Sequence, residues 1–164
     1  NFSGTKGILT AGHCSDNQYH NGSPLTFQSE SYGGSQDIQW HTAPNHTVDN
    51  LLDTGHNTPR SITSTRSRNL QSVGDFVCMH GKYSGYKCGF ISDKNYTRTT
   101  LPNPNATWIR VHNDADDLSQ GGDSGAPWFN SSTALGIHAA GIGDDAIYMA
   151  INYISALNVS VLTQ

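Results

Sequence analysis

Charged residues are scarce in this chain of 164 residues, and long apolar runs are absent. Only 13% of the residues are charged, and the formal net charge is -4. Because nucleic acids and anionic membranes attract positively charged surfaces, this balance gives no reason to expect either as a partner. No apolar run reaches the ~18 residues of a membrane-spanning helix, and no signal peptide is recognisable. We therefore expect a soluble, already processed protein.

Cysteine is also scarce, and the three cysteines cannot all pair within one chain. Cys78 and Cys88 flank a segment whose Gly81 and Gly85 can reverse the chain direction. A hairpin clasped by a disulfide is the expected result in an oxidising compartment. Cys14 is left over, so it is either a buried free thiol or the partner of a cysteine on a segment absent from this sequence.

Asn-X-Ser/Thr sequons are more frequent than the roughly three that chance would supply in a chain so rich in Ser and Thr. They indicate a secreted glycoprotein made on a eukaryotic secretory route, although a bacterial host would leave them unmodified. The candidate glycosylation sites are Asn1, Asn21, Asn45, Asn95, Asn105, Asn130 and Asn158.

Short apolar segments separated by turn residues recur along the chain and carry β-branched or aromatic side chains, which is typical of an all-β barrel or sandwich. Helix is expected only over about 150–157, where Ile151, Ile154 and Leu157 approximate one helical face. The polar segment 54–72 could link two halves, and the length predicts a single domain over 1–164. The expected strands include residues 7–11, 25–28, 37–40, 75–79, 88–92, 107–111, 126–129, 135–140 and 146–151.

Three polar residues stand in contexts that suggest nucleophilic catalysis. Ser124 lies in "SQGGDSGAP", where glycines would let a tight loop expose its hydroxyl. A serine hydroxyl is a weak nucleophile, so it needs a histidine base and an acid that orients the base. His13 follows the apolar segment of "ILTAGHC", and Asp37 precedes the apolar segment of "QDIQW". Asp49 and Asp53 are the alternative acids, although no apolar segment frames them as well.

These motifs, in the order His, Asp, Ser, resemble those of the chymotrypsin-like serine endopeptidases. "VCMHGKYSGYKCG" and "ISALNVSVL" are similar to the small secreted streptogrisin and α-lytic branch, so the likeness covers nearly the whole chain from residue 7. The resemblance implies two antiparallel six-stranded β-barrels, about 1–66 and about 67–164, with a short C-terminal helix. It further implies that His13 is the general base, Asp37 orients it and Ser124 attacks the scissile carbonyl. The N–H groups of Gly122 and Ser124 would form the oxyanion hole.

The substrate pocket of this family is walled by the loop before the serine and a later strand, here residues 118–120 and 135–141. A trypsin-like pocket needs an acidic residue at its base, and the corresponding position here is Leu118. Cleavage after basic residues is therefore not expected. "LGIHAAG" is similar to the strand that carries the carboxylate-binding histidine of glutamyl endopeptidases, which favours cleavage after Glu or Asp over an apolar or broad preference. The candidate substrate-binding residues are His138, Ser119, Leu118, Ala139, Ala140 and Gly141.

The sequence departs from the family pattern in two places that matter for the site. Relatives carry a strand or two before the histidine motif, with a cysteine that pairs with the one after the histidine. We therefore expect an incomplete first barrel and a missing N-terminal segment that is disulfide-linked through Cys14. Asp123 needs a balancing cation, but Met79 stands where the branch has an arginine, which leaves His80 or Lys82 as substitutes.

Two other classes of function are alternatives to a peptidase. A protease-like module that binds protein without cutting it would fit the missing strand and Met79, but it has no reason to keep all three candidate catalytic residues. An esterase or lipase would want Gly-X-Ser-X-Gly on a strand-to-helix turn and its histidine last. We expect a monomer that acts on proteins or peptides without a cofactor or metal. The remaining histidines are interpreted as surface residues: His20, His41, His46, His56, His80 and His112.

Overall fold

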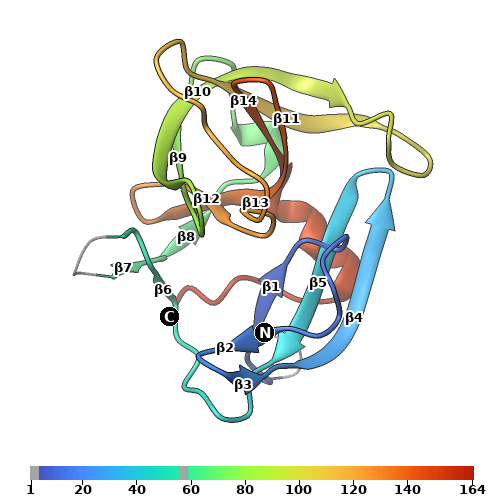
Figure 1. Ribbon diagram of the computed structural model, residues 1–164, viewed down its shortest axis with the longest axis vertical. Helices are drawn as coiled ribbons and strands as arrows, with labels where there is room; N and C mark the ends of the chain where they lie inside the picture. Colours follow the sequence, from blue (N-terminus) through green and yellow to red (C-terminus); the bar gives the residue numbers. More distant parts are fainter. Residues whose placement is uncertain (1–3, 56–58) are drawn as a thin grey trace.

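The computed structural model describes residues 4–55 and 59–164, so the predictions for Asn1 and His56 lie outside the described residues. The chain forms two halves that lie against each other, the first in blue and cyan and the second from green to red in Figure 1. Each apolar segment named above lies wholly or partly in a strand, which confirms the all-β prediction at the level of elements. Among the described residues, no helix is both long and apolar enough to cross a membrane.

The first half is an open antiparallel sheet rather than a barrel. Strands β1 (Gly7–Thr10), β5 (Gln36–Thr42) and β4 (Thr26–Gly33) lie in the order β1-β5-β4. Two short ladders join β2 (Tyr19–His20) to β3 (Ser23–Pro24), and β6 (Leu51–Leu52) to β7 (Arg60–Ser61). Among the described strands a complete six-stranded barrel is therefore found only in the second half, and the first barrel is incomplete, as expected, because these two-residue ladders do not close the sheet of β1, β5 and β4 into a cylinder.

The second half contains a closed barrel of six antiparallel strands. They follow the order β12-β9-β10-β11-β14-β13, and pairing between β12 and β13 closes the ring. Strand β8 (Ser64–Thr65) adds to β13 in parallel, and a 3-10 turn η1 (Arg68–Leu70) follows it. The barrel strands are β9 (Phe76–Gly81), β10 (Gly85–Thr97), β11 (Ala106–His112), β12 (Pro127–Asn130), β13 (Thr133–Ile142) and β14 (Asp145–Ala150).

The predicted disulfide is present. Cys78 and Cys88 lie opposite each other in the β9–β10 hairpin and are bonded, whereas Cys14 is a free, half-buried thiol. The bond clasps the hairpin ten residues apart in sequence, as the two glycines between them had indicated. It therefore fixes the base of a hairpin whose turn borders the site described below.

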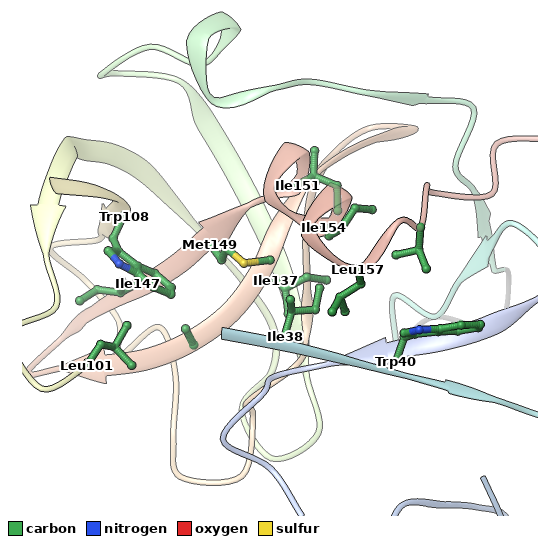
Figure 2. Packing of buried hydrophobic residues seen from close by; sticks show 12 residues of the cluster. Ile38, Trp40, Leu101, Trp108, Ile137, Ile147, Met149, Ile151, Ile154 and Leu157 are labelled. Atoms are coloured by element: carbon green, nitrogen blue, oxygen red, sulfur yellow. The ribbon is translucent and has the colours of Figure 1, made fainter. Parts of the chain in front are cut away.

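One apolar cluster joins the two halves. Ile38 and Trp40 of β5 pack with Met149 of the barrel and with Ile154 and Leu157 of the short helix η2 (Ile151–Leu157), as Figure 2 shows. The predicted C-terminal helix is confirmed, and it is a 3-10 helix that ends at Asn158 in the left-handed conformation. The packing of η2 between the sheet and the barrel fixes the relative position of the two halves.

Strand β14 explains why one segment of the sequence is apolar without alternation. All six of its residues are buried. Ile147 and Met149 point into the cluster shared by the two halves, while Tyr148 and Ala150 point into the barrel interior. Because both faces of the strand meet apolar surroundings, the pattern typical of a half-exposed strand is absent.

Candidate active site

Ser124 lies at the junction of the two halves, in the loop that precedes β12. The next residue, Gly125, has a φ of +89°, and a Cβ on it would lie 2.2 Å from Thr10 Oγ1 at the end of β1. Only glycine fits this close approach between the halves. The loop then joins the barrel, since Gly125 N–H donates to His138 O and His138 N–H donates to Ala126 O.

The three predicted catalytic residues meet in one chain of hydrogen bonds. His13 Nδ1 lies 2.8 Å from Asp37 Oδ2, and His13 Nε2 lies 2.8 Å from Ser124 Oγ. An ionised carboxylate only accepts hydrogen bonds, so Nδ1 carries the proton and Nε2 presents its lone pair to the hydroxyl. The arrangement can therefore draw the Ser124 proton onto His13.

The polar face of strand β5 positions His13 and the backbone on either side of it. Ile38 and Trp40 face the apolar cluster, so the alternating residues Asp37, Gln39 and His41 point to the other side, and all three are almost fully buried. Gln39 Nε2 donates to the carbonyls of Ala11 and Cys14, which bracket His13. Sequence reasoning missed Gln39, because nothing local distinguishes it from a surface glutamine.

The interpretation of His41 as a surface residue was wrong. His41 is 1% exposed, and its Nε2 lies 2.8 Å from Gln39 Oε1. Because Gln39 gives its N–H groups to two carbonyls, its oxygen faces His41, which must then carry its proton on Nε2. Burial lowers the pKa of His41, which keeps the ring neutral.

Asp37 has a second partner that the sequence did not reveal. Arg98 Nη1 donates to Asp37 Oδ2 at 2.7 Å, and the Arg98 guanidinium lies 4.6 Å from the centre of the Trp108 ring. Burial raises the pKa of Asp37, but the hydrogen bonds from His13 and Arg98 outweigh it, so the pKa lies below its usual range. No signal in the sequence links residues 37 and 98, because they belong to different halves.

The alternative acids lie outside this chain of hydrogen bonds. Both carboxylates are exposed and are used in local turns. Asp49 Oδ1 accepts from Asn50 N–H, and Asp53 Oδ1 accepts from Gly55 N–H. The structure therefore brings Asp37, and neither rival, to His13.

The loop before Ser124 presents two backbone N–H groups that donate to no protein acceptor within residues 4–55 and 59–164. They belong to Gly122 and Ser124, the residues expected to form an oxyanion hole. Gly122 has a φ of +97°, and a Cβ on it would lie 2.4 Å from Tyr83 Cε2, so both backbone angle and space require glycine. Tyr83, in the turn of the β9–β10 hairpin, thus packs on the loop that carries Gly122 and Ser124.

Asp123 is held by backbone donors where a cation was expected. Its Oδ1 accepts from the N–H groups of Tyr83 and Ser84, and its Oδ2 accepts from Gln120 N–H. Burial raises the pKa of Asp123, and the donors from Ser84, Gln120 and Tyr83 outweigh it and lower the pKa. In the described parts of the chain neither His80 nor Lys82 forms an ion pair with Asp123, so neither takes the place of the arginine.

His138 is buried beside the site. It is 2% exposed, and Trp128 Nε1–H donates to its Nδ1 at 3.4 Å. The indole nitrogen can only donate, so the proton of a neutral His138 is on Nε2. Burial, more than any nearby charge, lowers the pKa of His138 to about 4.

The other residues assigned to the pocket divide into two groups. Leu118 and Ala139 are core residues, 0% and 3% exposed, so their side chains are occupied by packing. Ser119 carries a buried Oγ that has no hydrogen-bond partner among the described residues, and a Cβ on Gly141 would lie 2.7 Å from that oxygen. Ala140 is half-buried. Of the residues assigned to the pocket, His138 and Ser119 are the two with polar side chains, and neither lines the cavity beside Ser124.

A cavity of about 900 Å³ opens beside the reacting atoms. Its walls include His13, Ser124, Gly122, Tyr83 and Cys14. Burial raises the pKa of the Cys14 thiol, so it is not primed as a competing nucleophile. Ser124 thus lines a cavity that is large enough to hold a ligand.

Most described sequon asparagines are accessible. Asn21, Asn45, Asn95, Asn105 and Asn158 are exposed. Asn130 is half-buried, and its amide nitrogen, the atom that would carry a sugar, donates to Phe76 O.

No family model matches the chain. Streptogrisin-C of Streptomyces griseus is 28% identical over 143 residues, which make up 84% of this chain and 30% of that protein. The chain therefore spans less than a third of the length of this curated relative.

Solved structures give the same picture. Thermobifida fusca protease A matches with a TM-score of 0.82 and 26% identity, over 99% of this chain and 88% of that chain. A glutamic-acid-specific serine protease, described as using a histidine triad in substrate binding, matches with a TM-score of 0.81 and 25% identity, over 98% and 89%. These findings confirm the resemblance to the small chymotrypsin-like serine proteases of the streptogrisin and α-lytic branch.

Proposed function

We propose that this chain, which resembles small chymotrypsin-like serine proteases in sequence and in fold, is a serine endopeptidase. The observation that carries the proposal is the pair of 2.8 Å contacts that His13 makes with Asp37 and Ser124. His13 is the general base, Asp37 orients its ring, and Ser124 is the nucleophile. No cofactor takes part in this chemistry.

The reaction proceeds in two acyl transfers. Ser124 Oγ bonds to the peptide carbonyl carbon while its proton passes to His13 Nε2, and the N–H groups of Gly122 and Ser124 donate to the oxyanion. His13 then gives the proton to the amine as the peptide C–N bond breaks. Water repeats the sequence on the acyl-enzyme and releases the acid. Loss of one oxyanion donor typically costs about 3 kcal/mol of transition-state stabilisation.

Replacement of the nucleophile tests this function. Ser124→Ala is expected to lower kcat on a peptide substrate by more than roughly 10⁴-fold, because no other hydroxyl can form the acyl-enzyme. Ser92→Ala, a change of the same size on an exposed strand residue, is the control and is expected to leave kcat unchanged. Tight peptide binding by a wild-type protein that does not hydrolyse the peptide would instead favour the protease-like binding module.

We also propose a preference for Glu, and secondarily Asp, before the scissile bond. Neutral His138 can donate from Nε2 to a carboxylate, and the unpartnered Ser119 Oγ can supply a second donor. Among the described residues, the aromatic ring in contact with His138 is Trp128 and not a second histidine, so the proposed site contains one histidine. The alternative is an apolar or broad preference, with His138 as a core residue.

Peptides that differ only before the scissile bond decide between these specificities. We expect kcat/KM to be greater for Glu than for Gln, Phe or Lys. Of these four side chains, only that of Glu offers a charged carboxylate that can accept from both His138 and Ser119. His138→Phe is expected to reduce the preference for Glu over Gln while hydrolysis of the Phe peptide persists. A wild-type preference for Phe would remove this claim and leave the catalytic triad in place.

An additional strand remains part of the proposal for this protein. The edge of β1 that faces away from β5 is unpaired among the described strands, and an apolar cavity of about 300 Å³ is lined by Ile8, Leu51 and Val161. A further segment could pair with the free edge of β1 and form a disulfide with the free thiol of Cys14. Mass spectrometry of the secreted protein from its source is expected to find a disulfide-linked peptide on Cys14, and a free thiol there would contradict this.

A further inference from the structure

The buried charge of Asp37 needs a positive partner in the resting enzyme. Asp37 is 0% exposed, and its carboxylate accepts from His13 N–H, His13 Nδ1–H and Arg98 Nη1–H. A neutral His13 accepts the hydrogen bond of the Ser124 hydroxyl at Nε2, so in this state its ring adds no positive charge beside Asp37. Within the described residues, Arg98 is thus the permanent cation in contact with Asp37. A buried carboxylate without such a partner is strongly destabilising.

Arg98 is held in place from several sides. It directly follows β10, which belongs to the second half, whereas Asp37 lies on β5 of the first half. The side chain of Arg98 is only 10% exposed, and its guanidinium lies over the Trp108 ring at 4.6 Å. Its carbonyl accepts from Leu101 N–H in a tight turn. Arg98 therefore has little freedom to leave Asp37.

We propose that Arg98 is a positioning residue that keeps Asp37 ionised and sets the pH at which the His13–Asp37 pair takes up a proton. The inference rests on the proposed function, since it assigns Arg98 a part in the same catalytic site. It goes beyond the three residues found from motifs, because none of those motifs includes residue 98.

The direction of the effect follows from electrostatics. Arg98 shares Asp37 Oδ2 with His13, so its charge offsets the attraction of the carboxylate for an imidazolium. Removal of that charge raises the affinity of the pair for a proton, whichever of the two groups holds it. Cys14 and His138 are the other titratable groups electrostatically coupled to this pair. Neither carries a permanent charge, so neither replaces Arg98.

The pH dependence of kcat/KM tests the proposal on the whole chain. Arg98→Gln removes the charge and retains an N–H donor, so we expect the acid limb of the profile to move to higher pH by about one unit. Arg98→Lys retains the charge and is expected to hold the limb near its wild-type position. A substrate without an ionisable side chain excludes titration of the ligand.

A matched variant separates a local effect from the change in net charge. Arg66 pairs with Asp75 away from the cleft, and Arg66→Gln is expected to leave the acid limb unmoved. The proposal is contradicted if Arg98→Gln leaves the limb in place, or if Arg66→Gln moves it equally far.

Stability provides a second readout that does not depend on activity. If Arg98 balances the charge of Asp37, the thermal stability lost in Arg98→Gln is largely recovered when Asp37→Asn is added. If Arg98→Gln alone does not fold, the double variant is still expected to fold. Failure of the double variant to recover stability contradicts the charge balance. An inactive wild type with an intact stability cycle would reject the proposed peptidase and retain the Arg98–Asp37 coupling.

Discussion

At the scale of single residues, the direction of each key hydrogen bond follows from groups that can only accept or only donate. Asp37 accepts, which places a proton on His13 Nδ1. Trp128 donates, which places the proton of neutral His138 on Nε2. The carbonyls beside His13 accept from Gln39, which turns the Gln39 oxygen toward His41. The tautomers that the proposed chemistry needs are thus consequences of local pairing.

His138 makes stability depend on pH in a defined window. Its pKa is about 4 in the folded chain against 6.5 for an ordinary histidine. Between these values the unfolded chain binds the extra proton, so stability is retained above pH 6.5 and falls as the pH drops toward 4, by up to about 3 kcal/mol. His138→Gln is expected to flatten this part of the curve of unfolding free energy against pH, measured by urea denaturation.

The difference between wild type and His138→Gln isolates His138, because His41, whose pKa burial also lowers, is present in both proteins. Asp37 and Asp123 have pKa values lowered below 3.8, so the stability that they contribute is lost at lower pH. His20→Gln, at an exposed histidine, is the matched control. An equal fall in stability between pH 6.5 and 4 in wild type and His138→Gln would contradict the assignment.

Gln39 offers a test of how the His13 turn is held. Gln39→Met removes the donors to Ala11 O and Cys14 O, so we expect His13 to lose its alignment and kcat to fall roughly 10- to 100-fold with little change in KM. Rates are normalised to the concentration of titrated active sites. Gln28→Met, an exposed amide on β4, is the control. An unchanged kcat in Gln39→Met would show that backbone packing alone positions the turn.

Sequence reasoning found the residues that motifs mark and missed those that only folding brings near. His13, Asp37 and Ser124 stand in recognisable local contexts, whereas Arg98 and Gln39 reach the site through contacts distant in sequence. Leu118 and Ala139 were assigned to the pocket because they flank it in the chain. Leu118 lies in the loop between β11 and β12 and Ala139 lies in β13, and both side chains pack in the core, which the motifs alone do not show.

At the scale of elements, strands were predictable and their closure was not. Each apolar segment became a strand because its side chains suit a pleated, half-buried surface. Whether strands close into a barrel depends on pairing between distant edges, which β-propensity does not encode. The β9–β10 hairpin was predictable for a local reason, since its cysteines and glycines specify a clasp and a turn. Its contact with Asp123 was not.

That hairpin turn holds the loop of the proposed oxyanion hole, and Gly81 makes the contact possible. A Cβ at residue 81 would lie 2.5 Å from Asp123 Cγ, so Gly81→Ala must displace either the turn or Asp123. We expect kcat to fall at least roughly 10-fold, with weaker binding of a boronic acid that mimics the tetrahedral intermediate. Gly121→Ala is the control, because its Cβ would meet nothing within 4 Å. Equal kinetics of the two variants would argue against a role for the turn.

At the scale of the whole molecule, the candidate site depends on the junction of two halves. His13 and Asp37 come from the open sheet, and Ser124 comes from the barrel side. Figure 2 shows the shared apolar cluster around η2, and its packing between the sheet and the barrel holds the two halves, and with them these residues, in place. The sequence predicted both a C-terminal helix and a two-part architecture. It did not show that η2 packs between the sheet and the barrel, because that depends on which surfaces of the two halves meet.

Truncation within this cluster is expected to weaken the whole fold. Ile154 is 4% exposed between the sheet and the barrel, so Ile154→Ala should lower the free energy of unfolding by about 2–4 kcal/mol, measured by chemical denaturation. Ile142→Ala, at an isoleucine 41% exposed, is expected to change it by no more than about 0.5 kcal/mol. A loss in Ile154→Ala as small as in the control would mean that η2 contributes little to the junction.

Labelling of the folded protein with a serine-directed organophosphonate, followed by peptide mass spectrometry, tests the central claim most directly. We expect a single adduct on Ser124, formed rapidly by the wild type and at least roughly 10³-fold more slowly by His13→Ala, because the hydroxyl then lacks its base. Absence of the adduct from a folded wild type, or its formation at equal rates in both proteins, would contradict the catalytic pairing of His13 with Ser124.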